Sequence, residues 1–389
     1  MKTLTPAFAL MQGAIWAIYG SIYSYSSVYL LSCSLSNTAI GLCLGATIGV
    51  CFFLQILAGE VLNRSGRTAL MRFLAGCSIL LLALCLLLLF LRPGLWAVCP
   101  FLAACLLIQL LPALINSAGV YELQLGAGLN VGVGRGTGSL GCAVCSVVVG
   151  RLLVGTDTRP MFVAGLALSA ALAVGCLWFH ARAAGCPEQQ ASAPSGGLNL
   201  RFLRLYPTFA LVLCGMVLIM LGHTFVSNFL YQITAAKGGN EWDTGIAGAI
   251  AAVAELPALF AFGYLSRRAS CALWLKLSGL LLVFKLLTAF LAEGVPALWA
   301  SELLQVGYGL FTVSGIYYAS RTIPHRDSIS AQAYLGAAST LGVFLSLLLG
   351  GGVIDQLGVP MLLLLGTLSA ALGTAVVCLA AGRSPDGPA

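Results

Sequence analysis

A series of long apolar runs limits the folds that this chain can adopt. Each run has about 20 predominantly apolar residues, the length that an α-helix needs to cross the hydrocarbon core of a bilayer. Charged residues make up only 8% of the sequence, against about 25% in soluble domains, too few to cover a water-facing surface. We therefore predict an all-α integral membrane protein with twelve transmembrane helices, at 6–31, 38–60, 70–91, 95–120, 136–155, 161–181, 205–232, 244–265, 271–291, 296–319, 328–351 and 360–381.

The predicted helices form two groups of six, separated by the longest polar stretch of the chain. That stretch, 183–204, is rich in proline, serine and glycine, a composition typical of a flexible linker between two bundles. We therefore predict an N-terminal six-helix bundle over 1–182, a cytoplasmic linker over 183–204 and a C-terminal six-helix bundle over 205–389.

Lys and Arg residues indicate the orientation of these helices. If both termini are cytoplasmic, the outer loops hold only Arg92, Arg159 and Lys237. The inner segments then hold Lys2, Arg64, Arg67, Arg72, Arg135, Arg182, Arg201, Arg204, Arg267, Arg268, Arg321, Arg326 and Arg383. Because cytoplasmic loops carry the excess of Lys and Arg, we predict a multi-pass protein of the cytoplasmic (plasma) membrane with both termini inside the cell. The net charge of +7 then follows from topology, and we expect no nucleic-acid partner.

A polar segment, 59–67, separates the second predicted helix from the third. It contains Gly59, Asn63, Arg64, Gly66 and Arg67. The two glycines allow a tight turn with backbone conformations that are closed to other residues. The two arginines suit the anionic cytoplasmic face of a membrane.

A degenerate copy of this segment occurs in the second half of the chain. One constant offset aligns Gly41 with Gly245, Gly59 with Gly263 and Arg64 with Arg268. An internal repeat of this kind indicates two parallel halves related by an axis along the membrane normal. Chance similarity between two hydrophobic segments is the alternative.

Glu255 is the clearest candidate for a functional charge inside the membrane. It lies near the middle of the predicted helix 244–265, with no other charge nearby in sequence. A charge at the bilayer centre costs about 2.5–3.5 kcal/mol on insertion scales, so its presence needs a reason. We predict that Glu255 takes up and releases a proton; a structural carboxyl that is protonated or paired is the alternative.

Depth in the membrane predicts a partner for Lys285. Lys285 and Glu302 each lie within about 8–9 Å of the outer end of their predicted helices, whereas Glu255 lies roughly 16 Å from its outer end. We therefore predict a static ion pair between Lys285 and Glu302, which leaves Glu255 to titrate or to meet substrate. Alternatively, the two side chains reach the outer interface and have no functional role.

Further polar and aromatic residues are candidates for a substrate pathway. Glu122 and Arg135 flank a predicted cytoplasmic connection, where a solvated salt bridge is the alternative. His223 and Asn228 are uncharged polar residues of the predicted helix 205–232, and packing is the alternative for His223. In the first predicted helix Trp16, Tyr19 and Tyr23 share one face, which suits stacking on a sugar ring or an aromatic substrate.

No group of residues indicates catalysis or a bound cofactor. No nucleophile, base and oxyanion donor converge in the sequence, so we do not predict an enzyme. The fourteen cysteines are scattered through apolar segments, and the C-x-x-C of Cys142 and Cys145 lies inside a predicted helix without a histidine nearby. We therefore expect no metal and no cofactor, with a proton gradient as the energy source.

Nearly the whole chain resembles the major facilitator superfamily of transporters. The family's loop between its second and third helices has the pattern G-x-x-x-(D/E)-R-x-G-R, which Gly59, Arg64, Gly66 and Arg67 match. Asn63 stands where the family usually has a carboxylate. Our hypothesis is that Arg64 and Arg67 clasp carboxylates or helix C-termini at an inner gate, which a neutral Asn63 loosens because an amide forms no charge-assisted hydrogen bond.

Several segments resemble more narrowly the branch that holds lactose permease and the phenylpropionate and nucleoside proton symporters. These segments are Arg135–Gly141, with Thr137 in place of the branch's tryptophan, Glu255 in Ala254–Pro257, and Gln332 followed by Gly350, Asp355 and Gly358. The resemblance implies that Arg135, Glu122 and Glu255 bind substrate. Lys285 stands where the branch usually has an arginine and Gln305 where it has a histidine, so the proton-coupling residues are altered or relocated.

We therefore predict a monomeric secondary transporter, surrounded by membrane lipid, that imports a small solute together with protons by alternating access. A sugar, an oligosaccharide or a small aromatic acid fits the candidate residues best. Two alternatives stay open: a proton-coupled exporter of hydrophobic compounds, and a sensor that binds a ligand on a transporter scaffold without moving it.

Overall fold

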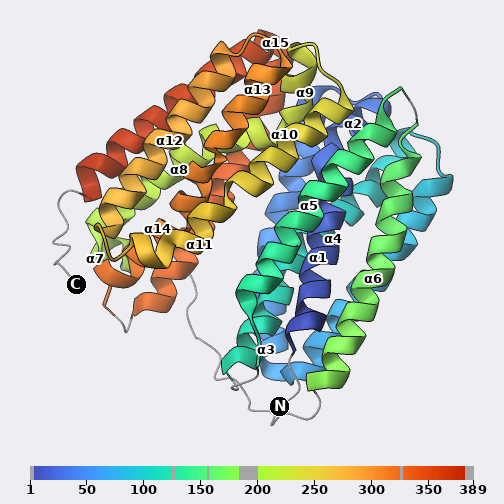
Figure 1. Cartoon of the computed structure of the whole chain (residues 1–389), viewed down its shortest axis with the longest axis horizontal. Helices are drawn as coiled ribbons and strands as arrows, with labels where there is room; N and C mark the ends of the chain where they lie inside the picture. Colours follow the sequence, from blue (N-terminus) through green and yellow to red (C-terminus); the bar gives the residue numbers. More distant parts are fainter. Residues whose placement is uncertain (1–3, 125–127, 156, 184–199, 325–326, 382–389) are drawn as a thin grey trace. The chain divides into compact units, whose positions relative to one another are not determined.

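A computed structural model describes residues 4–124, 128–155, 157–183, 200–324 and 327–381, and these ranges are helical and contain no strand (Figure 1). The side chains of 59–66, 120, 123–124, 200–201 and 328–329 lie outside the described part. The elements are α1 (Thr5–Ser21), η1 (Tyr23–Tyr25), α2 (Ser26–Ser32), α3 (Asn37–Phe90), α4 (Leu95–Gln124), α5 (Val131–Leu153), α6 (Arg159–Ala183), α7 (Leu200–Leu205), α8 (Pro207–Asn228), α9 (Leu230–Ala236), α10 (Glu241–Ala254), α11 (Leu256–Leu265), α12 (Cys271–Leu291), α13 (Val295–Glu302), η2 (Leu303–Gln305), α14 (Val306–Thr322) and α15 (Ser328–Ala381).

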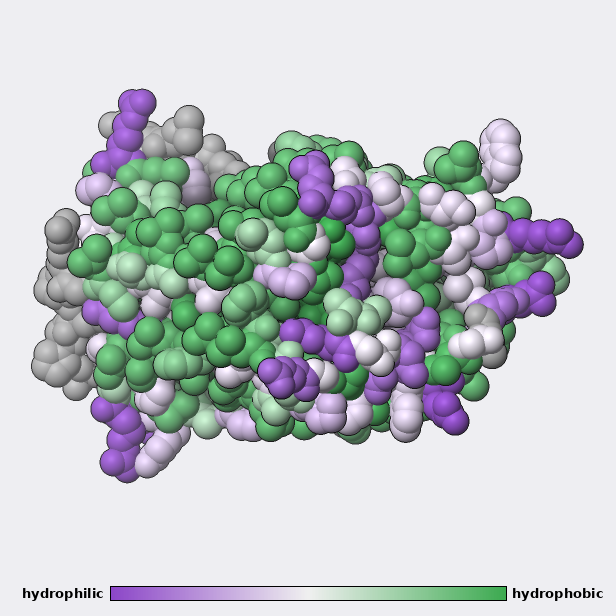
Figure 2. Space-filling model, turned by 90° about the horizontal axis from the view of Figure 1, so that it is seen from above, coloured by the Kyte–Doolittle hydropathy of each residue, from purple (hydrophilic) through white to green (hydrophobic). Residues whose placement is uncertain are grey.

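Nine helical segments in the described ranges are long enough and apolar enough to cross a membrane. Large apolar side chains are exposed along them, among them Phe53 at 66%, Phe260 at 62% and Leu379 at 71% of their surface. Figure 2 shows such apolar side chains over much of the visible face. Lipid stabilises a surface of this kind and water does not, because exposed apolar area on this scale drives association in water.

Four predicted helices contain a short break. The predicted helix 6–31 is interrupted by η1, 205–232 between α8 and α9, 244–265 between α10 and α11, and 296–319 by η2. The third break has a clear cause in Pro257, which lies in the first turn of α11. Proline has no backbone N–H, and its ring clashes with the carbonyl four residues earlier, so a helix cannot continue through it undisturbed.

Two long helices each cover two predicted spans. In α15 the backbone turns at Gly358, whose φ of 81° favours glycine, and Pro360 follows. In α3, helical structure continues through 59–67, where the sequence predicted a tight turn. Gly59 and Gly66 permit a turn but do not require one, and neither is a proline, so the helix is not forced to end here. The gate residues Gly59, Asn63, Arg64 and Gly66 have side chains outside the described part.

The chain divides into two compact units. The first unit holds Met1–Ser36, Ala46–Ala193 and Asn240–Ala252, and the second holds Asn37–Gly45, Pro194–Gly239 and Val253–Ala389. The beginning of α3 thus belongs to the second unit, and most of α10 belongs to the first. The predicted linker 183–204 stays a prediction, because its residues 184–199 lie outside the described part.

Each unit contains a close backbone approach at a glycine that the internal repeat aligns. In the second unit, a Cβ atom on Gly41 would lie 2.2 Å from the carbonyl oxygen of Leu347. In the first unit, a Cβ atom on Gly245 would lie 2.4 Å from the carbonyl oxygen of Ser146. Both distances are too short for any side chain, so the two aligned positions require glycine for the same physical reason.

Asp355 of α15 binds the beginning of α3. Its Oδ1 accepts a hydrogen bond from Asn37 Nδ2 at 2.8 Å, and its Oδ2 accepts from the N–H and the hydroxyl of Thr38, each at 2.7 Å. Gln232 Nε2 donates to Asn37 Oδ1 at 3.0 Å. A carboxylate satisfies the free N–H groups of a helix N-terminus and interacts favourably with the helix dipole. These bonds explain why the beginning of α3 belongs to the second unit.

Candidate functional site

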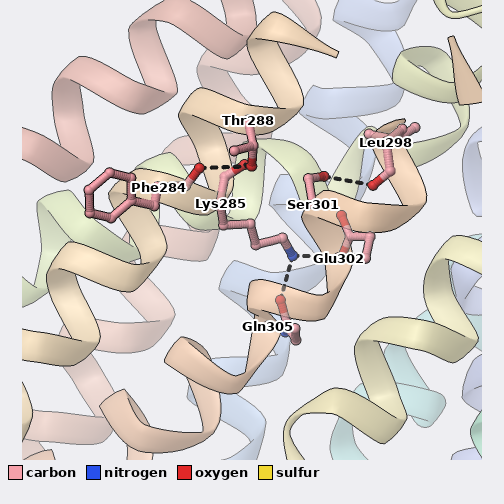
Figure 3. A network of polar contacts seen from close by, with 7 residues as sticks. All are labelled: Phe284, Lys285, Thr288, Leu298, Ser301, Glu302 and Gln305. Carbon is pink, nitrogen blue, oxygen red and sulfur yellow. Dashed lines mark hydrogen bonds and ion pairs between the residues drawn. The ribbon is translucent and has the colours of Figure 1, made fainter. Parts of the chain in front are cut away.

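The second unit contains a buried network of charged and amide side chains (Figure 3). Lys285 of α12 donates from Nζ to Glu302 Oε2 at 2.7 Å and to Gln305 Oε1. Lys285 and Glu302 are each only 1% exposed. Glu302 ends α13 and Gln305 ends η2, and side chains three residues apart in a 3₁₀ turn lie above one another. This local geometry directs both side chains to the same lysine.

The predicted ion pair between Lys285 and Glu302 is confirmed. Both side chains are buried, so the alternative in which they reach the outer interface is wrong. Glu302 Oε1 has no hydrogen-bond partner among the described residues. Gln305, at the position where the resembled branch has a histidine, acts as a neutral acceptor for the lysine N–H. The network is therefore held together by Lys285, which carries the only positive charge in it.

His223 and Asn228 of α8 lie in the same unit. The His223 ring stacks on Tyr308 of α14, with ring centres 4.7 Å apart and an angle of 20° between the planes. Its Nδ1 is buried and has no hydrogen-bond partner in the described part of the chain. Asn228 Nδ2 donates to Ser346 Oγ at 2.8 Å. Both residues therefore contact neighbouring helices of the second unit, as packing residues do.

Glu255 lies at the break between α10 and α11, and not in a continuous helix as predicted. Its side chain is half-buried. Gly309 of α14 packs against the break, and a Cβ atom there would lie 2.7 Å from the Glu255 carbonyl oxygen. The break and the glycine together hold the backbone of Glu255 against α14. Pro257 indicates this break in the sequence, but the prediction of a continuous helix over 244–265 did not take it into account.

The first unit contains a buried arginine–carboxylate clamp. Both Arg67 Nε and Arg67 NH2 donate to the Glu122 carboxylate, and Arg67 NH1 donates to the Ala183 carbonyl oxygen at 2.7 Å. Arg67 is 5% exposed and Glu122 is 1% exposed. The clamp joins α3, α4 and the C-terminus of α6, where a positive charge also interacts favourably with the helix dipole. The hypothesis that Arg67 clasps a carboxylate and a helix C-terminus agrees with this geometry, whereas a solvated salt bridge at Glu122 does not.

The remaining predicted residues lie outside these clusters. Arg135 of α5 is exposed. Gly263 lies in α11 with nothing within 4 Å of an added Cβ atom. Arg268, just beyond α11, has its guanidinium carbon 5.0 Å from the ring centre of Tyr264. The second copy of the gate segment therefore contains an arginine–aromatic contact.

The predicted aromatic face of the first helix is confirmed. The ring centres of Trp16 and Tyr19 lie 5.4 Å apart, and those of Tyr19 and Tyr23 lie 4.8 Å apart in a stacked arrangement. Gly138 of α5 packs against Trp16, because a Cβ atom there would lie 2.6 Å from the indole. We call the three rings of Trp16, Tyr19 and Tyr23 the aromatic ladder. Trp16 and Tyr19 are half-buried, so part of the aromatic surface of this ladder is accessible.

Sequence reasoning missed four amide side chains around this ladder. Gln12 Nε2 donates to Asn116 Oδ1 at 2.7 Å. The Tyr23 hydroxyl is hydrogen-bonded to Gln109, and Gln55 Nε2 donates to the Gln109 carbonyl oxygen at 3.2 Å. Gln109 and Asn116 are seven residues apart in α4, a spacing that places them on one face of the helix. That signal was available in the sequence.

Comparison with known proteins gives a structural match only. No protein-family model matches the chain, and no curated protein matches it in sequence. A point mutant of the nucleoside transporter NupG matches with a TM-score of 0.79 and 15% identity, over 97% of this chain and 100% of that one. The chain has the fold of the major facilitator transporters.

Two further solved structures have the same fold. One is a bacterial homologue of the human lysosomal transporter Spinster, with a TM-score of 0.75 and 14% identity over 97% of this chain and 96% of that one. The other is a bacterial homologue of the iron transporter ferroportin, with a TM-score of 0.68 and 13% identity over 98% of this chain and 99% of that one. These three solved structures are of transporters, and the nine apolar helical segments in the described ranges fit a multi-pass membrane protein.

Proposed function

We propose that this protein is a proton-coupled secondary transporter that imports a small polar solute by alternating access. The proposal includes twelve membrane spans, cytoplasmic termini and a place in the plasma membrane. The clamp of Arg67 with Glu122 and the end of α6 would form part of the inner gate. The full-length likeness to transporter structures supports the transport function, and the charged groups inside the helices support proton coupling.

The observation that carries the proposal is the buried Lys285–Glu302–Gln305 network. An ion pair in the apolar interior needs a reason, because desolvating two charges costs several kcal/mol. Since Lys285 already neutralises Glu302, the proposal assigns proton uptake to Glu255, at the helix break of the same unit. Glu255 lies at that break, where its backbone packs on Gly309, and a glutamate side chain can take up and release a proton.

The aromatic ladder supports a solute with a ring and polar edges. Trp16 and Tyr19 provide aromatic surface, and Tyr23 and the amides nearby provide hydrogen-bonding groups. Stacking on such surface suits a sugar or a flat heterocycle. NupG, which shares the fold, is a nucleoside transporter, so nucleosides join sugars as candidate substrates. Arg135, an exposed residue of α5 in the same unit, would contribute a further contact to the solute.

Replacing Glu255 by glutamine tests the assignment of the proton site. We expect Glu255→Gln to abolish pH-dependent accumulation of substrate, because glutamine has the same shape but cannot take up and release a proton. The experiment is first a screen of labelled sugars, nucleosides and aromatic acids in proton-driven membrane vesicles. The variant is then measured with the solutes that the wild-type protein accumulates.

Glu293→Gln is the matched control, because Glu293 is an exposed carboxylate beyond the end of α12. We expect the control to accumulate substrate as the wild-type protein does. Unchanged pH-dependent accumulation in Glu255→Gln would show that the proton binds elsewhere. Resistance of expressing cells to toxic compounds, without uptake of any solute in the screen, would favour export over import.

A further inference from the structure

Gln12, Trp16 and Asn116 form a chain of hydrogen bonds within the first unit. Trp16 Nε1 donates to Gln12 Oε1 at 3.2 Å, and Gln12 Nε2 donates to Asn116 Oδ1 at 2.7 Å. Gln12 is completely buried, whereas Trp16 and Asn116 are half-buried. The chain therefore joins the aromatic ladder of α1 to an amide on α4, 104 residues further along the sequence.

Trp16 determines the direction of these hydrogen bonds. The oxygen and nitrogen of a side-chain amide have nearly the same shape, so their placement follows from the hydrogen-bond network. The indole of tryptophan can only donate. Gln12 must therefore turn its oxygen toward Trp16 and its NH₂ group toward Asn116. Asn116 must then turn its oxygen toward Gln12, which directs its own NH₂ group away from the chain.

The NH₂ group of Asn116 is left with no hydrogen-bond acceptor in the described part of the chain. Asn116 lies on a half-exposed face of α4 that also carries Gln109, seven residues earlier. Polar groups on a face in contact with lipid would leave donors unsatisfied at a high free-energy cost. We therefore infer that this face of α4 meets water or solute.

We propose that Asn116 is a specificity-determining residue that donates a hydrogen bond to an acceptor atom on the edge of the solute. The solute is then an uncharged ring compound that lies against the Trp16–Tyr19 surface with a carbonyl oxygen toward Asn116. The class of solute in this inference rests on the proposed transport function, whereas the direction of the Asn116 NH₂ group follows from the hydrogen bonds alone. A solute with an amino group in place of that carbonyl would bring two donors together, and the site would bind it more weakly.

The test uses uridine and cytidine, which carry a carbonyl oxygen and an amino group at the same ring position. Binding is measured as ligand-induced thermal stabilisation of the full-length protein in detergent, and uptake is measured in proteoliposomes. We expect the wild-type protein to favour uridine about tenfold, because bound cytidine would leave the Asn116 donor without an acceptor. Binding in detergent needs no proton gradient, so it tests the site separately from transport.

Asn116→Asp is the decisive variant. An aspartate oxygen can still accept from Gln12 Nε2, so the chain is retained, but the outward atom becomes an acceptor. We expect the preference to reverse toward cytidine. Trp16→Phe keeps an aromatic ring but removes the donor that sets the direction, so we expect the preference to shrink toward equality. Ser117→Ala is the control and should keep the wild-type preference, because the Ser117 hydroxyl donates to the Ala113 carbonyl of its own helix.

The outcomes separate the two claims. A reversed preference in binding without any uptake would support the role of Asn116 and contradict transport of these solutes. If the ratio of uridine uptake to cytidine uptake is the same in the wild-type protein and in Asn116→Asp, the transport function is supported and the role of Asn116 is overturned. Equal weakening of both ligands in Asn116→Asp would reduce Asn116 to a structural residue. If the wild-type protein binds neither nucleoside, the proposed class of solute is wrong.

Discussion

Replacing Lys285 by methionine is expected to destabilise the protein by about 3–5 kcal/mol, because it leaves Glu302 buried without its positive partner. The pair is held at 2.7 Å with both side chains almost completely buried, so water cannot compensate for the loss. Gln305, the third member of the network, would lose its donor as well. The measurement is chemical unfolding of the purified protein in detergent, followed by helical circular dichroism.

Lys276→Met is the matched control, because Lys276 is a half-buried lysine on the same helix, α12, and no ion pair is found for it in the described residues. We expect a change within about 0.5 kcal/mol for this control. The double variant Lys285→Met/Glu302→Met should recover much of the lost stability, since replacing both charges of a buried pair by apolar groups is often neutral. Equal stability of Lys285→Met and Lys276→Met would contradict the structural role given to Lys285.

Replacing Arg67 by methionine is expected to have an effect of the same size, about 3–5 kcal/mol of stability, together with a strong loss of transport. Arg67 binds the Glu122 carboxylate with two N–H groups and the end of α6 with a third. Without it, three helices of the first unit lose their common anchor, and the buried Glu122 carboxylate loses two charged N–H donors. Arg67→Lys should recover only part of the loss, because an ammonium group cannot form the two parallel bonds.

Arg72→Met serves as the control for this experiment. Arg72 lies five residues further along α3 and is exposed, so its loss should leave stability and uptake unchanged. Adding Glu122→Gln to Arg67→Met removes the buried negative charge and should restore stability more than it restores transport. Wild-type stability in Arg67→Met alone would show that the clamp contributes little, and the gate hypothesis would then lose its basis.

The parts of the fold that depend on local sequence could be predicted. Apolar runs of spanning length gave the helices, and Lys285 could be matched with Glu302 because depth in a membrane follows from counting residues along a helix. The shared face of Trp16, Tyr19 and Tyr23 follows in the same way from helical spacing. The helices and the aromatic face follow from one helix each, and the ion pair follows from two helices that are consecutive in sequence and from the position of the membrane.

Contacts between distant helices could not be predicted from the sequence. Glu122 was expected to face Arg135 or substrate, but it meets Arg67, 55 residues away, because the packing of α3, α4 and α6 brings the two together. The contact between Gln12 and Asn116 also joins distant helices, although the seven-residue spacing of Gln109 and Asn116 was visible in the sequence. The helix break at Glu255 is different, because Pro257, two residues later, indicates it in the sequence. The break was not predicted because the apolar run has the length of one continuous membrane-spanning helix.

The most direct test of the account is proton movement during solute entry. The proteoliposomes contain a pH-sensitive dye, and no proton gradient is imposed across their membrane. A solute that the wild-type protein accumulates is then added outside. We predict that the interior acidifies with wild-type protein and does not acidify with Glu255→Gln. Entry of the solute without a change of internal pH, or with alkalinisation of the interior, would contradict proton-coupled import.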